Sequence, residues 1–78
     1  MGGDSDIVHR ISKDIDEFYE NLDGLDAKLL SRKAAEVVEM AKLYASDARS
    51  YLAKNDTHTA FSCISYAHGL LDAVREMQ

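Results

Sequence analysis

Proline is absent from this 78-residue chain, and beyond residue 3 its glycines are Gly24 and Gly69. Tight turns and sheet connections depend heavily on these two residue types, so a β-rich domain of this size would need more of them. The scarcity of turn residues therefore favours a few long helices. Scaling with mass predicts roughly 4,700 Å² of exposed surface for a folded chain of 8.7 kDa, which allows one small core.

The composition excludes several classes of protein. Hydrophobic residues make up 46% and charged residues 29%, a balance typical of globular rather than disordered chains. Nine basic and 14 acidic residues give a net charge of -5, which disfavours nucleic-acid binding. A single cysteine cannot form an intramolecular disulfide, and no apolar run approaches the ~20 residues that span a bilayer. We expect a cytoplasmic protein that binds neither nucleic acid nor membrane.

The first predicted helix covers approximately residues 5–22, where apolar residues recur at steps of three and four. Gly24 follows it and is expected to end the helix in a left-handed conformation. The apolar stripe consists of Ile7, Val8, Ile11, Ile15, Phe18 and Leu22.

The second predicted helix covers approximately residues 27–54 and is the longest. Its start has two candidates, because Asp26 could cap a start near Ala27 and Ser31 could cap a later one. A heptad-like seam runs along it, and the alanines in that seam predict a close approach of a neighbouring helix. The seam consists of Leu30, Ala34, Val37, Ala41, Tyr44, Ala48 and Tyr51.

The third predicted helix covers approximately residues 57–77, with Asp56 or Thr57 as its N-cap. The short connection before it forces an antiparallel hairpin, which places Tyr51 near Ala60 and Tyr44 near Ala67. Two parallel stripes cover about half of its circumference, more than one neighbour requires. They are Ala60, Ile64, Ala67, Leu71 and Val74, and beside them Cys63, Tyr66, Leu70, Ala73 and Met77.

These segments predict one all-α domain over residues 1–78. Its fold is an antiparallel up-down-up three-helix bundle with a long central helix and a C-terminal helical hairpin.

A family resemblance rests on residues 39–77, above all on the run Tyr66-Ala67-His68-Gly69-Leu70-Leu71-Asp72-Ala73. This half of the chain resembles the C-terminal half of small archaeal proteins of unknown function, domain-of-unknown-function family 357. Most members have glycine before the aspartate of the turn, whereas this chain has Asn55, which also tolerates left-handed geometry. The resemblance implies a small helical fold and an archaeal, cytoplasmic origin, and it implies no activity.

His68 and Asp72 lie four residues apart on one side of the third helix, with Tyr44 and Asp47 across the hairpin. We interpret these four as a structural polar network in which His68 bonds to Tyr44 or Asp47. The alternative is a small-ligand or metal site, although a metal needs three or four ligands within reach. We therefore expect no bound metal and no cofactor.

A strip of small residues on the third helix, Ser62, Ser65 and Gly69, would let another backbone approach closely. Glycine inside a helix costs up to about 1 kcal/mol relative to alanine, so Gly69 needs a packing reason. The first helix of the same chain is the favoured occupant of this strip. A partner helix or a second copy is the alternative.

No phosphate-binding loop, paired cysteine motif or nucleophile motif is present, so we expect no catalytic residue and no enzyme. The favoured function is a non-enzymatic protein-interaction or assembly module that self-associates, with its protein partner unspecified. The wide apolar surface of the third helix supports this prediction. A ligand-binding or metal-binding protein is the main alternative. RNA binding is disfavoured because Glu39 interrupts the basic residues Lys28, Arg32, Lys42 and Arg49.

Overall fold

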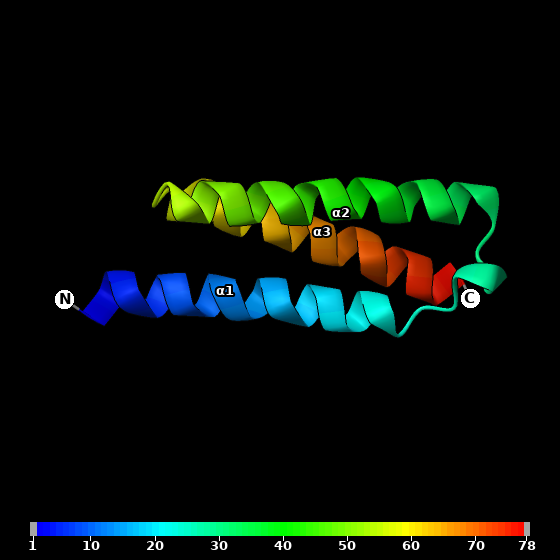
Figure 1. Ribbon diagram of the computed structural model, residues 1–78, viewed down its shortest axis with the longest axis horizontal. Helices are drawn as coiled ribbons and strands as arrows, with labels where there is room; N and C mark the ends of the chain where they lie inside the picture. The colour runs from blue at the N-terminus through cyan, green and yellow to red at the C-terminus, as the bar shows by residue number, and fades with distance from the viewer. Residues whose placement is uncertain (1, 78) are drawn as a thin grey trace.

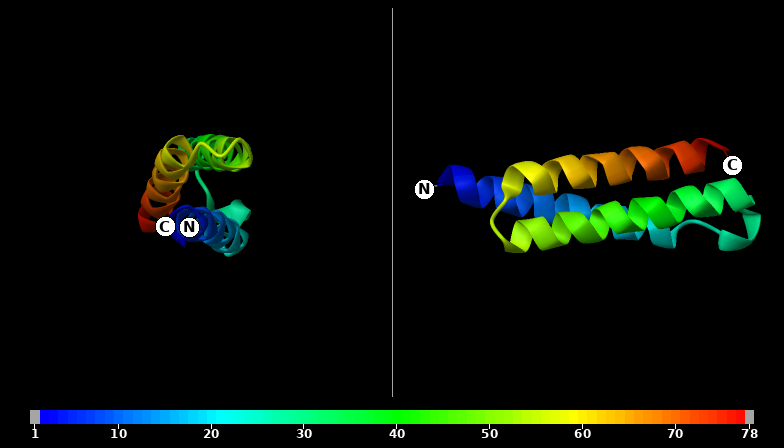
Figure 2. Two further views of the ribbon diagram at one scale, coloured as in Figure 1. Left: turned by 90° about the vertical axis from the view of Figure 1, so that its left-hand side faces the viewer. Right: turned by 90° about the horizontal axis from the view of Figure 1, so that it is seen from above.

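The computed structural model describes residues 2–77, and side chains from Asp6 onward. It contains three α-helices, α1 (Gly2–Asp23), α2 (Arg32–Ala53) and α3 (Thr57–Met77), and a 3₁₀ turn, η1 (Ala27–Leu29). α1 and α3 run in the same direction with α2 opposite to both (Figure 1), and the end-on view shows them around one axis (Figure 2). The bundle is a rod of 45 × 16 × 15 Å. The predicted up-down-up three-helix bundle is confirmed.

The end of α1 differs from the prediction at Gly24, which does not adopt a left-handed conformation. The last turn of α1 instead ends in a tighter, 3₁₀-type turn. The Gly24 N–H donates to the Asn21 carbonyl at 3.2 Å, and the Leu25 N–H donates to the Leu22 carbonyl at 3.1 Å. Such three-residue hydrogen bonds satisfy the last carbonyls of a helix without a positive φ.

Both candidate N-caps of the second predicted helix, Asp26 and Ser31, are used, each for a different element. An Asp26 side-chain oxygen accepts from the Lys28 N–H at the start of η1, and the Ser31 hydroxyl accepts from the Ala34 N–H at the start of α2. The later candidate start is therefore correct, and the predicted boundary of 27 is too early. As a result α2 has 22 residues, as does α1, so the expected long central helix is not longer than its neighbour.

The connection between α2 and α3 has the predicted turn chemistry. Asn55 adopts a φ of 64°, the left-handed conformation that asparagine tolerates. Its N–H donates to the Leu52 carbonyl, and the Asp56 N–H donates to the Tyr51 carbonyl, which together form a Schellman motif. Asp56 Oδ1 then accepts from the Thr59 N–H at 3.1 Å and caps α3.

The predicted inner stripe of α3, from Ala60 to Val74, is fully buried. The predicted seam of α2 is only partly right, because Val37, Tyr44 and Tyr51 are half-buried. The buried stripe is turned around the helix because α2 must face α1 as well as α3. Its members are Ala34, Val38, Ala41, Ala45 and Ala48.

Small residues along α2 bring it close to α3, and these two helices share the most extensive contact in the bundle. α1 has a larger contact with α3 than with α2. The buried side chains of Ile11, Ile15 and Phe18 anchor it in the bundle. Its first turns extend past the tip of the α2–α3 hairpin (Figure 1), and nearby Ile7 is half-exposed.

Candidate interaction surfaces

His68 joins α3 to α1. Its Nε2 atom lies 2.8 Å from the backbone carbonyl oxygen of Asp14, and its ring meets the ring of Phe18 edge-to-face at 5.9 Å between centroids. A carbonyl oxygen can only accept, so Nε2 carries the proton and donates it. The half-buried imidazole therefore fixes the axial position of α1 against α3.

The predicted polar cluster of Tyr44, Asp47, His68 and Asp72 is not assembled. Tyr44 packs against Tyr66, with ring centroids 4.6 Å apart. Asp72 lies 3.8 Å from a guanidinium nitrogen of Arg75, and Asp47 is exposed. The prediction failed because the rotation of α3 that buries its apolar stripe turns His68 toward α1 rather than α2. Among the side chains of residues 6–77, no three His, Cys, Asp or Glu residues are grouped as metal ligands.

Cys63 is half-buried near the outer edge of the α2–α3 contact. Burial raises the pKa of its thiol, and the nearby carboxylates of Asp47 and Asp56 raise that pKa further. The thiolate is the reactive form of cysteine, so this environment makes Cys63 a weak nucleophile.

The strip of Ser62, Ser65 and Gly69 is exposed along its whole length. A Cβ atom added at Gly69 would meet no other atom within 4 Å. The expectation that α1 covers this strip is therefore wrong. α1 lies on the side of α3 that carries His68 and Phe61, so no other described part of the chain approaches the backbone at Gly69.

The exposed part of α3 lacks charge over most of its length. Residues 57–71 contain no Asp, Glu, Lys or Arg, although a charged fraction of 29% corresponds to about four such residues in a stretch of 15. We call the exposed members of this stretch the uncharged face. They are His58, Phe61, Ser62, Ser65, Tyr66 and Gly69, and the side chains of Phe61 and Tyr66 are each about half exposed.

An apolar patch adjoins the uncharged face on the side of α2. Met40, Leu43 and Tyr44 share one side of α2 by their spacing, and Tyr44 contacts Tyr66 of α3. Leu43 is 67% exposed and Met40 is 47% exposed. We name Met40, Leu43, Tyr44 and Tyr66 together the Tyr44–Tyr66 patch. Met40 and Leu43 were not predicted as surface residues of interest, although their spacing to Tyr44 on the solvent side of the predicted seam indicates such a patch.

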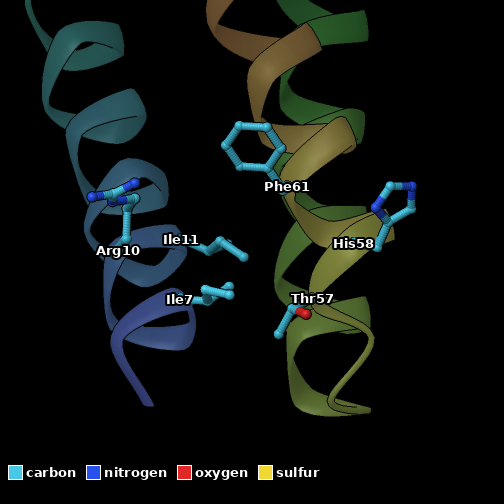
Figure 3. Close-up of a pocket in the computed structure, with 6 residues that line it drawn as sticks. All are labelled: Ile7, Arg10, Ile11, Thr57, His58 and Phe61. Atoms are coloured by element: carbon cyan, nitrogen blue, oxygen red, sulfur yellow. The ribbon is translucent and has the colours of Figure 1, made fainter. Parts of the chain in front are cut away.

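A cleft of about 300 Å³ lies between α1 and the start of α3 (Figure 3). Ile7 and Ile11 point from α1 toward α3, whereas the imidazole of His58 points away from α1. The surface of the cleft is mainly apolar, and the cleft is open to solvent. Its lining consists of Ile7, Arg10, Ile11, Thr57, His58 and Phe61.

A model of a protein family of unknown function, DUF357, matches residues 13–78. The chain belongs to the DUF357 family. This match covers most of the molecule and confirms the resemblance recognised in residues 39–77. No curated protein matches the sequence.

Within this DUF357 chain, the family match includes all of the uncharged face and the Tyr44–Tyr66 patch. The α1 wall of the cleft, from Ile7 to Ile11, precedes the matched residues. The two surfaces on α2 and α3 are thus part of the family domain, and the cleft is only partly so. From Gly2 to Met77, the helices fall short of the length and apolar character required of a membrane span.

Proposed function

We propose that this DUF357 protein is a non-enzymatic protein-interaction module that acts in the cytoplasm. The observation that carries the proposal is the uncharged face of α3. Charged side chains ordinarily occupy exposed positions, and the central parts of protein interfaces are depleted of them. The exposed face of α3, which has no charged side chain over 15 residues, therefore resembles the centre of an interface more than ordinary surface.

The composition of the adjoining Tyr44–Tyr66 patch supports the same function. Tyrosine and methionine are enriched at interface centres, and both occur there with half of their surface in water. A ligand-binding role has less support, because Nε2 of His68 donates to the Asp14 carbonyl, whereas Tyr44 packs against Tyr66 and Asp72 lies beside Arg75.

The basic residues of α2 give little support to RNA binding. Lys42 pairs with Glu39 at 3.0 Å, and the guanidinium of Arg49 lies over the ring of Tyr19 at 5.2 Å from its centroid. Phosphate recognition needs several cations that are available together.

Photo-crosslinking in the cells that produce the protein tests the proposal. Tyr66 is replaced by p-benzoylphenylalanine, and the matched control carries the same group at the exposed Ser46 of α2. We expect a discrete protein adduct on irradiation of the Tyr66 variant and none from the Ser46 variant. Equal labelling at both positions, or no adduct at Tyr66, would overturn the proposal.

A further inference from the structure

We propose that the partner of the uncharged face is a second copy of this chain, with the two α3 helices packed antiparallel about a two-fold axis. This inference rests on the proposed function and names the partner. It depends on a repeating pattern, on surface area and on charge.

The pattern is a second heptad-like seam on the outer side of α3. Ser62, Tyr66, Gly69 and Ala73 follow steps of four, three and four residues, and all four are exposed. Tyr66 is a large residue between the small Ser62 and Gly69, just as Ile64 lies between Ala60 and Ala67 in the buried seam of the same helix. A seam of this kind is typical of a helix with a packed neighbour, and here no helix of the chain provides one.

The outer seam is complementary to itself when two copies run antiparallel. A two-fold axis between residues 67 and 68 places Tyr66 beside Gly69 of the second copy and Ser62 beside its Ala73. Two-fold symmetry repeats both pairs, so each tyrosine ring covers a glycine. The open space around Gly69 would then be filled, and this glycine would have the packing reason that the single chain lacks.

The exposed area of the chain leaves room for such an interface. The protein exposes 5440 Å², which exceeds by roughly 700 Å² the roughly 4,700 Å² expected for a compact monomer of its mass. A standard stable interface buries about 800 Å² of each partner. The long side of a 45 × 16 Å rod is large enough to supply this area, whereas its end is not.

Charge favours this face over the others. Two copies with a net charge of -5 each repel, so self-association needs a surface without acidic side chains at its centre. At the margins, the antiparallel arrangement brings Glu76 of each copy near the α3 N-terminus of the other. The positive end of the helix dipole and His58 lie there.

Sedimentation equilibrium of the full chain, with a matched pair of variants, tests the inference. Gly69→Glu places one carboxylate of each copy against Tyr66 of the other, next to the two-fold axis, and Ser46→Glu adds the same charge at an exposed position of α2. We expect wild type and Ser46→Glu to reach twice the 8.7 kDa chain mass, and Gly69→Glu to weaken dimerisation at least about 100-fold. A monomeric wild type at all concentrations, or equal weakening by both substitutions, would overturn the inference.

Cysteine cross-linking tests the orientation in a Cys63→Ser background. We expect a mixture of Ser62→Cys and Ala73→Cys chains to form a mixed disulfide more readily than either variant alone. Faster cross-linking of Ser62→Cys with itself would indicate parallel helices and would contradict the proposed geometry. The photo-crosslinked adduct separates the two proposals, since an adduct at Tyr66 with another protein would support the interaction function and overturn self-association.

Discussion

Truncation of Ile64 to alanine is expected to destabilise the bundle severely, because the core around it cannot close over the cavity. Ile64 is fully buried in a cluster that contains five fully buried alanines, Ala41, Ala45, Ala48, Ala60 and Ala67. An alanine side chain has no rotamer that could swing into a void. The structure around the site therefore relaxes little, and the cavity term adds to the lost transfer free energy.

The magnitude follows from the groups removed. Three carbons at about 0.8 kcal/mol each give about 2.4 kcal/mol of transfer free energy. The unfilled cavity raises the expected loss to about 4 kcal/mol, within the usual range of about 2–5 kcal/mol. A domain of 78 residues has a free energy of unfolding of about 4–12 kcal/mol, so this loss is at least a third of the total.

Urea unfolding followed by circular dichroism measures the loss. The matched control is Ile7→Ala, which removes the same atoms at a half-exposed position and is expected to cost about 1 kcal/mol. If Ile64→Ala does not fold, Ile64→Val is the informative variant, with an expected loss of about 1 kcal/mol. Equal losses from Ile64→Ala and Ile7→Ala would refute the argument that the alanine core holds a rigid cavity.

Four further outcomes are expected. In dilute solution, Gly69→Ala raises the free energy of unfolding by up to about 1 kcal/mol, because the added methyl group meets open space; a loss of stability in thermal melts would contradict this. His68→Phe lowers stability by about 1 kcal/mol through the lost hydrogen bond to Asp14 and leaves thermal shifts with divalent metals unchanged, whereas a lost metal response would revive the ligand-site hypothesis. The hydrogen bonds from Thr59 lower the pKa of Asp56, so its stabilising effect over Asp56→Ala is complete above about pH 4, the unfolded pKa, and declines as acid protonates the folded carboxylate; urea titrations that show a pH-independent difference would contradict this. Alkylation of Cys63 with iodoacetamide at pH 8 is slower in the folded chain than in urea, and equal rates would show that burial does not hold its pKa high.

Local features of the sequence predicted the fold well. The α3 stripe at steps of four and three is buried as expected, and Asn55 and Asp56 form the expected turn, because each property depends on neighbours along the chain. The start of α2 could not be decided, since Asp26 and Ser31 are both competent caps and both are used.

Properties that depend on three helices at once were harder to predict. Two helices packed only against each other would have Val37 and Tyr44 at the centre of their contact. Packing against α1 as well shifts the buried stripe of α2 to Val38 and Ala45, and His68 bonds to α1 instead of α2. The predictions of a polar cluster around His68 and of α1 covering Gly69 were wrong for the same reason, because both depend on how α1 packs against the hairpin.

The unequal packing of the helices has a consequence for the order of folding. α2 and α3 are joined by three residues and share the most extensive contact, so their pairing closes a short loop. Contacts between neighbours in sequence form quickly, whereas α1 must reach α3 across the whole of α2. We expect the hairpin to form first and α1 to dock last. Amide protons of α1 should accordingly exchange with deuterated solvent faster than those at the centre of α3, through opening events in which α1 alone detaches.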